Sequence, residues 1–447
     1  MYVCCSVSNL LNVIYVKYCQ IMNLIRTSLL FCLSLLTLLS CDKINQETHY
    51  RTIMPIYEKM STIRQMSVTL EEPRTIENFG KIYIYKDFLF INEPLKGIHI
   101  YDNSNPSQPY SVTFLNIPGN VDMAVKDNVL YADSYVDLLS FDLSVPTKPQ
   151  LVHRNEDVFK SVYRYNYETK SLTDIILRYV DTVLTHAEVD KYSPFLKKED
   201  KVFMDYYYSA NYSSGGNTSG NSGSTYGQGG SMARFTLAKE HLYTVDDRNL
   251  NLFNVSITKK PTFTKTINLG WGIETIFPYK NNLFIGSNAG MYIYNIDKPS
   301  DPVELSRYEH LRACDPVVVN DKYAFVTLRS GAACGGVQNV LEVVDIQNLK
   351  APKLVKSYQM KNPHGLGLYN NMLYLCEGEF GFKSFDISDV TAIDQHAVEN
   401  IENLKSTDVI VGPKSMIIIG PDGVCQYDYS NSKKIKLLSC INLNVPH

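Results

Sequence analysis

Short runs of alternating apolar and polar residues recur along most of this chain of 447 residues. Seven runs share one pattern: an alternating strand ends in Asp or Asn and often leads to a proline, as in GIHIYDNSNPSQP from Gly97. The terminal positions are Asp102, Asp142, Asn254, Asn295, Asp345, Asp386 and Asp428. They lie 40, 112, 41, 50, 41 and 42 residues apart, so the single long gap holds one repeat plus an insertion. Period-two alternation predicts strands rather than helices.

Each repeat holds three further strands. Two alternating runs precede the shared pattern, as in IYIYKDFLFI, and one follows it, as in PYSVTFLNI. The terminal Asp or Asn can accept a hydrogen bond from the backbone two residues on and so turn the chain into the outer strand. Four short antiparallel strands per repeat are typical of β-propeller blades. We therefore predict an all-β propeller of seven blades over residues 66–447. Residues 66–70 (MSVTL) form a further outer strand that either closes the ring or changes the blade count by one.

The repeated strand-Asp-Ile-Ser-x-Pro pattern, as in VVDIQNLKAP and SFDISDV, resembles that of the LVIVD-repeat family. The resemblance covers residues 80–445 apart from the insertion and is strongest from Ser231 to Ser439. It implies a β-propeller on the cell surface of a bacterium or archaeon, and it brings no catalytic activity to transfer.

The N-terminal segment reads as a targeting signal. Residues 22–40 hold Arg26 and then an apolar run of about a dozen residues, which is short for a membrane span and suits a signal peptide. The sequence LLSC, ending at Cys41, resembles the lipobox of bacterial lipoproteins, whose cysteine is acylated. We predict lipidation at Cys41, a polar tether over 41–65 and a place in the cell envelope, at the outer membrane or cell surface of a Gram-negative bacterium. An ordinary secretory signal or an uncleaved anchor is the alternative, and residues 1–21 read as a spurious extension.

The insertion, residues 153–231, contains DIILRYVDTVLTHAEV, which suits either a long hairpin arm or a helix. It ends in a Gly/Ser-rich stretch typical of a flexible loop. Long loops often carry function, although a tolerated insertion explains this one equally well.

Net charge and cysteine spacing bear on three features: nucleic-acid binding, a disulfide and a zinc site. The net charge of -3 gives no electrostatic footprint for nucleic acid, which excludes that class of partner. Cys425 and Cys440 flank a turn at equal distances, which suits a disulfide across a hairpin or two buried thiols. No cysteine spacing suits zinc.

One ionisable residue stands near the start of the first strand of every unit. Counting back eight or nine residues from the second strand gives Lys81, Asp122, Arg234, Glu274, Asp315, His364 and Asp408. First strands are innermost in a propeller, so these side chains are expected to ring one mouth of the central channel. The ring is either a belt of ion pairs and caps that seals the channel or a polar funnel that binds a ligand.

The funnel interpretation has two variants. The carboxylates and His364 suit a divalent metal, whereas Lys81 and Arg234 suit an anion. Trp271, the only tryptophan, is either a stacking platform for a sugar or core packing.

Three functions fit the sequence. The first is a lipid-anchored, non-catalytic module that binds an envelope protein or a glycan. The second is a propeller enzyme acting on a carbohydrate or another polar substrate, with Asp315, His364, Glu274 and Asp408 as acid, base or metal groups. The third is a structural member of an envelope complex that docks through the insertion. No HExxH, GxxxxGK[ST], GxSxG or dinucleotide motif is present, and no cofactor is implied beyond the divalent metal of the second function. We favour the first.

Overall fold

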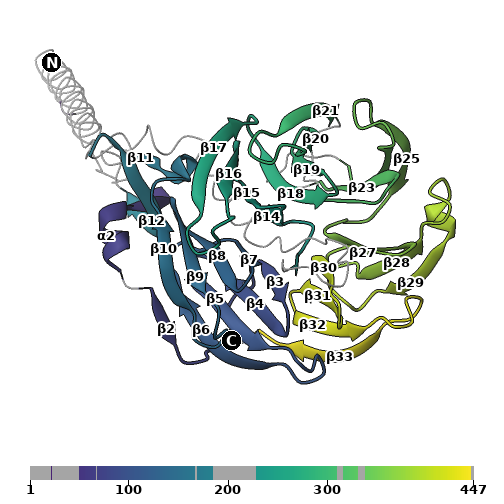
Figure 1. Cartoon of the computed structure of the whole chain (residues 1–447), viewed down its shortest axis with the longest axis horizontal. Helices are drawn as coiled ribbons and strands as arrows, with labels where there is room; N and C mark the ends of the chain where they lie inside the picture. The colour runs from purple at the N-terminus through teal and green to yellow at the C-terminus, as the bar shows by residue number, and fades with distance from the viewer. Residues whose placement is uncertain are drawn as a thin grey trace, which may run out of the picture. The chain divides into compact units, whose positions relative to one another are not determined.

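The computed structural model describes Met22 and residues 50–66, 68–166, 169–184, 228–309, 316–330 and 338–443. Two compact units divide the chain: Met1–Thr52 with Thr182–Ser193, and Ile53–Asp181 with Pro194–His447. The larger unit is built from seven antiparallel sheets that follow one another around a centre (Figure 1). The all-β propeller with seven four-stranded blades is therefore confirmed.

The strands of each blade are consecutive in sequence. Blade 1 consists of β3 (Ile82–Tyr85), β4 (Phe88–Glu93), β5 (Gly97–Asp102) and β6 (Tyr110–Asn116). Blade 2 consists of β7 (Met123–Lys126), β8 (Val129–Ser134), β9 (Asp137–Asp142) and β10 (Gln150–Asn155). Blade 3 consists of β14 (Phe235–Ala238), β15 (His241–Val245), β16 (Asn249–Asn254) and β17 (Thr262–Asn268). Blade 4 consists of β18 (Ile273–Tyr279), β19 (Asn282–Ser287), β20 (Gly290–Asn295) and β21 (Val303–Glu309).

The remaining three blades follow the same order. Blade 5 consists of β22 (Val317–Val319), β23 (Tyr323–Leu328), β24 (Val340–Asp345) and β25 (Lys353–Gln359). Blade 6 consists of β26 (Leu366–Tyr369), β27 (Met372–Cys376), β28 (Phe382–Asp386) and β29 (Ala397–Ile401), with a short 3-10 helix at Ile393–Gln395. Blade 7 consists of β30 (Asp408–Val411), β31 (Met416–Gly420), β32 (Gly423–Asp428) and β33 (Lys436–Ile441).

The repeated Asp or Asn makes the turn that the sequence predicts. In all seven blades its side-chain oxygen accepts a hydrogen bond from the backbone N–H two residues on, at 2.8–3.0 Å. Each residue therefore satisfies a backbone donor at the point where the third strand turns into the outer one.

The core lies between neighbouring blades. In the first six blades the third residue of the second strand is a fully buried aromatic residue: Phe90, Tyr131, Tyr243, Phe284, Phe325 and Tyr374. Burying one such side chain stabilises the fold by about 1.5–3 kcal/mol, so this repeated position contributes strongly in each blade.

The ring closes through side chains rather than through an exchanged strand. Blade 7 is complete with its own four strands, and Ile82 and Leu89 of blade 1 pack in one apolar cluster with Ile417 and Ile419 of blade 7. Nε2 of Gln426 donates to Oδ1 of Asn103 at 2.6 Å across the same junction. The further outer strand expected over 66–70 is β2 (Thr69–Glu71), which pairs with β6 and extends blade 1 instead of closing the ring.

Residues 50–65, expected within a polar tether, form β1 (Tyr50–Lys59) and the helix α2 (Met60–Gln65). Arg64 of α2 donates to both carboxylate oxygens of the buried Asp137, at 2.9 and 2.7 Å. Met60 and Ile63 pack against Tyr135, so both polar and apolar contacts fix this helix on blade 2.

Part of the insertion is a strand arm. β11 (Arg164–Asn166) follows a short 3-10 helix at Lys160–Val162 and pairs with β12 (Ser171–Leu184), which lies between β11 and β1 in a three-stranded sheet. Of the two conformations left open for this segment, the described residues adopt the strand. No helix among the described residues is both long and apolar enough to cross a membrane.

Cys425 and Cys440 lie opposite each other on β32 and β33, and a disulfide joins them. Cys376 is a buried free thiol. Cys41, the residue expected to carry the lipid, lies outside the described residues, as do residues 23–40 of the signal segment.

Candidate functional site

Four of the seven expected ring residues stand where the innermost strands begin. Lys81, Asp122 and Arg234 immediately precede β3, β7 and β14, and Asp408 is the first residue of β30. Lys81 and Asp122 are each 3% exposed, and Asp408 is fully buried. The side chains of Lys81, Asp122 and Asp408 are therefore largely closed off from solvent.

The chain itself fills the centre of the ring. The residues 228–233, which we call the central segment, return from the insertion and begin with β13 (Gln228–Gly229), which pairs with the inner edge of β3. Nζ of Lys81 donates to the carbonyl of Met232 at 2.7 Å. Oγ of Ser231 donates to Asp408 at 3.2 Å and accepts from the backbone of Leu366 at 3.1 Å. The central segment thus contacts blades 1, 6 and 7, and Ala233 also accepts from Ile276 of blade 4.

Asp122 ties the end of the central segment to blade 2. Its Oδ2 accepts from the backbone N–H groups of Arg234 and Phe235, at 2.6 and 3.1 Å, and its Oδ1 accepts from Met123 at 2.7 Å. Burial raises the pKa of Asp122, and the nearby Lys81 opposes that rise. The carboxylate acts here as a cap for strand-end amides.

Burial also shifts the other central groups. It lowers the pKa of Lys81 to about 8, against the opposing effect of Asp122. It raises the pKa of Asp408 well above the usual range of a carboxyl, which favours the neutral acid. Oδ2 of Asp408 is buried and has no hydrogen-bond partner among the described residues.

Glu274 and His364 lie near the same centre, close to Arg329, whose position the sequence left open. Burial lowers the pKa of Arg329, which follows β23, and Glu274 opposes that effect. Burial and then Arg329 lower the pKa of His364 to about 3, so its imidazole is neutral at neutral pH. Asp315 lies outside the described residues. Within the described part of the chain, no three His, Cys, Asp or Glu side chains form a group that could hold a metal ion.

An apolar-lined hollow lies beside the ring, over blades 1 to 3. It is a pocket of about 310 Å³ between the turns of these blades and the start of the insertion. Blade residues in its wall include Leu95, Tyr135 and Phe235, and insertion residues include Phe159 and Leu177. The insertion therefore forms part of a concave site rather than an unrelated loop.

Charged side chains of both signs line this pocket: Asp122, Asp133, Asp246, Asp247, Arg164, Arg178 and Arg234. Asp133 accepts from the backbone of Val121 and Asp122, at 2.8 and 3.0 Å, and from the side-chain amide of Asn120 at 2.8 Å. Burial raises the pKa of Asp133 to about 7, in spite of these donors. Burial and then Asp246 raise the pKa of Asp247, whereas Arg164, Arg234 and Arg248 oppose the rise.

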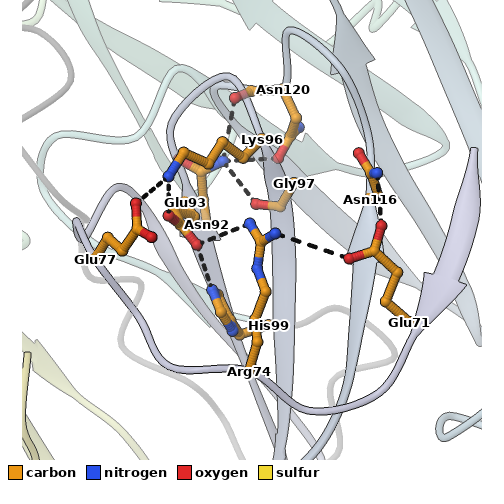
Figure 2. Close-up of polar contacts among 10 residues, drawn as sticks. All are labelled: Glu71, Arg74, Glu77, Asn92, Glu93, Lys96, Gly97, His99, Asn116 and Asn120. Atoms are coloured by element: carbon orange, nitrogen blue, oxygen red, sulfur yellow. Dashed lines mark hydrogen bonds and ion pairs between the residues drawn. The ribbon is translucent and has the colours of Figure 1, made fainter. Parts of the chain in front are cut away.

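A buried polar network holds the turn that carries Pro94 and Leu95 into the pocket wall. Figure 2 shows Glu93 at its centre. The carboxylate accepts hydrogen bonds from His99 at 2.8 Å, Lys96 at 2.7 Å and Arg74 at 3.1 Å. Lys96 also pairs with Glu77 at 2.5 Å. Asn92 binds the carbonyl of Gly97 at 3.2 Å and so closes the same turn. The network positions one wall of the pocket.

Trp271 lies near the pocket but not in its wall. It is 49% exposed, and the guanidinium of Arg248 lies 4.7 Å from its ring centroid. The backbone of its neighbour Gly272 donates to the carbonyl of Asp247 at 2.9 Å. Core packing is thus not its role, and its exposed ring adjoins the turn that carries Asp247.

Sequence reasoning missed Asp133, Asp247, Arg164 and Arg178. The two aspartates stand at the end of the second strand of blade 2 and just after that of blade 3, a position that varies from blade to blade. The two arginines lie in the insertion, for which the repeat gives no register. The one available signal was the insertion itself.

No family description matches this sequence, and no curated protein matches it. Solved structures do resemble the chain. The computationally designed Ika8 protein has a TM-score of 0.49 and 9% identity, over 83% of this chain and 90% of that one. Sqt1 of Saccharomyces cerevisiae has a TM-score of 0.46 and 9% identity, over 85% and 88%. Hsv2 of Kluyveromyces lactis has a TM-score of 0.43 and 10% identity, over 80% and 98%. At such low identity these similarities bear on the fold alone. The resemblance to the LVIVD-repeat family stays a prediction from the repeated motif.

Proposed function

We propose that this chain is a lipid-anchored propeller of the cell envelope that binds a protein or glycan partner without transforming it. The pocket beside the ring is the site that carries the proposal. Concave, mainly apolar sites with a few convergent polar groups are where ligands usually bind. Lys81, Asp122 and Asp408, offered by the sequence as acid, base or ligand groups, are engaged in holding the central segment. That engagement favours binding over catalysis at the ring.

The anchor is tested at Cys41. We expect Cys41→Ser to move the protein from the membrane fraction to the soluble fraction, because the acyl chains would have no attachment site. Cell fractionation followed by immunoblotting measures this. Ser40→Ala keeps a small residue before the cysteine and is the matched control, which should remain membrane-bound. Equal membrane retention of Cys41→Ser and wild type would argue against a lipid anchor.

The binding site is tested by filling the pocket. Leu177→Trp adds volume at the pocket wall, and Leu437→Trp adds the same volume at an exposed position on blade 7. We expect Leu177→Trp to weaken binding of envelope glycans or proteins at least tenfold and Leu437→Trp to leave it unchanged. Thermal shift with soluble glycans and affinity measurements with purified envelope proteins give the readout. A partner that binds Leu177→Trp as tightly as wild type would place the site elsewhere.

One observation favours the alternative function, an enzyme acting on a carbohydrate or another polar substrate. Asp133 lies in the pocket wall with a pKa raised to about 7, which suits a general acid or base at neutral pH. Incubation of the wild-type protein with the glycans that it binds, followed by mass spectrometry, separates the two functions. Bound glycans recovered intact support the binding module, and cleaved glycans support the enzyme.

A further inference from the structure

The pocket wall holds two side chains of opposite charge, Asp247 and Arg178, that form no hydrogen bond or ion pair with the residues that the structure describes. The other three aspartates of the wall are engaged: Asp122 and Asp133 accept backbone N–H groups, and Asp246 accepts from the backbone of Arg248 and Asn249, both at 2.9 Å. The carboxylate of Asp247 forms no hydrogen bond or ion pair with a described residue, although Arg164, Arg234 and Arg248 lie near enough to lower its pKa. It stands in the β15–β16 turn of blade 3.

Arg178 is the positive counterpart. It lies on β12 of the insertion, its side chain is exposed, and it makes no hydrogen bond or ion pair within the described part of the chain. Asp247 and Arg178 come from different elements of the pocket wall, and no ion pair joins them. A carboxylate and a guanidinium are thus available on separate parts of one wall.

The wall also has an apolar part. Leu95, Tyr135, Phe159, Val162 and Phe235 contribute to it, and the pocket of about 310 Å³ is at the small end of the range for ligand sites, roughly 300–1,000 Å³. A ligand of this size must bury an apolar body. A ligand that also offers a charge to each of the two side chains forms an ion pair at each end, and it gives the half-buried Asp247 the partner whose absence is costly away from water.

We propose that the pocket binds a small zwitterion with an apolar body, an apolar α-amino acid or dipeptide, whose ammonium pairs with Asp247 and whose carboxylate pairs with Arg178. The inference rests on the pocket of the proposed function and names a ligand class for it. Arginine can hold a carboxylate through two parallel hydrogen bonds. Asp247 is an acceptor-only group when ionised and suits an ammonium, which has only donors.

The test uses ligands that lack one charge. We would measure the affinity of the full chain for L-phenylalanine, L-leucyl-L-phenylalanine, 3-phenylpropionate and 2-phenylethylamine by isothermal titration calorimetry. The first two should bind at least tenfold more tightly than the last two. Asp247→Asn should lower the affinity for phenylalanine at least tenfold and leave the affinity for 3-phenylpropionate unchanged. Arg178→Gln should lower the affinity for phenylalanine by a similar factor and leave the affinity for 2-phenylethylamine unchanged. Asp422→Asn, in the exposed turn of blade 7 that corresponds to the turn of Asp247, is the matched control and should bind like wild type.

This crossed pattern would support the inference. Equal affinity for phenylalanine and for its one-charge analogues would overturn it, as would tight phenylalanine binding that both pocket variants retain. If none of the four ligands binds but a glycan or protein does and Leu177→Trp abolishes that binding, the inference fails and the proposed function stands. If no ligand of any class depends on Leu177, both fail.

Discussion

Glu93→Ala is expected to lower the free energy of unfolding by about 3–5 kcal/mol, the usual effect of removing one partner from a buried ion pair. The side chain of Glu93 is 1% exposed. It pairs with Lys96, with Arg74 and with the fully buried His99. Without the carboxylate, Nε2 of His99 loses its partner in a site that water does not reach. Chemical denaturation followed by tyrosine fluorescence or circular dichroism measures the change.

Glu77→Ala is the matched control, because Glu77 binds the same lysine from an exposed position (Figure 2). Solvent screens such a pair, so the loss should not exceed about 1 kcal/mol. Similar losses in the two variants would show that burial of Glu93 adds nothing, and the account of the network would then be wrong.

Acid should remove the contribution of Glu93. Burial raises the pKa of this carboxyl, but the hydrogen bonds from His99 and Lys96 outweigh burial and lower the pKa from 4.5 to about 2. A depressed pKa in the folded state gives stability that is complete above pH 4.5 and is lost as the pH falls toward 2. The difference in stability between wild type and Glu93→Gln should therefore shrink over this range. A difference that stays constant down to pH 2 would contradict the ionised form.

Gly365→Ala is expected to cost about 3 kcal/mol, the upper end of the usual range for overpacking. A Cβ atom at Gly365 would lie 1.7 Å from Oδ1 and 2.9 Å from Cα of Asp408, which is fully buried. The added methyl group would push Asp408 away from Ser231 and so loosen the central segment. Thermal and denaturant unfolding report the loss.

The double variant Gly365→Ala/Asp408→Ala tests the cause. Removing the Asp408 side chain eliminates the closest overlap, so the double variant should be more stable than the sum of the two single losses predicts. Simple additivity would mean that the cost of Gly365→Ala arises somewhere other than this contact.

The fold was predictable because its signals are local and repeated. Period-two alternation marks the strands, and the turn-forming Asp or Asn marks the same point in all seven blades, from Asp102 to Asp428. The closure of the ring was not predictable in the same way. Contacts such as Asn103 with Gln426 join residues more than three hundred positions apart, and no local pattern encodes them.

The candidate ring was only partly predictable. The carbonyl of Lys81 pairs with Asn92, and the equivalent carbonyls in blades 5 and 6 belong to Pro316 and Gly365. His364, counted nine residues back instead of eight, therefore lies one residue before the position equivalent to Lys81. In blade 4, a register shift at Glu274 has the same effect. Irregular strand starts of this kind leave no trace in the hydrophobic pattern.

The pocket was beyond sequence reasoning for a different reason. Asp247 and Arg178 both line the pocket because the insertion packs over blades 1 to 3, and neither residue belongs to a motif. The central segment was missed for the same reason, because residues that looked like the end of a flexible loop make contacts with four blades.

The central segment also has a consequence for the order of folding. Its partners lie as far as 177 residues away in sequence, at Asp408, and blade 7 is the last blade to leave the ribosome. Contacts over such separations form slowly, since a long loop must close before they form. We therefore expect the ring to close late in folding, after blade 7 has formed and Asp408 has accepted the hydrogen bond from Ser231.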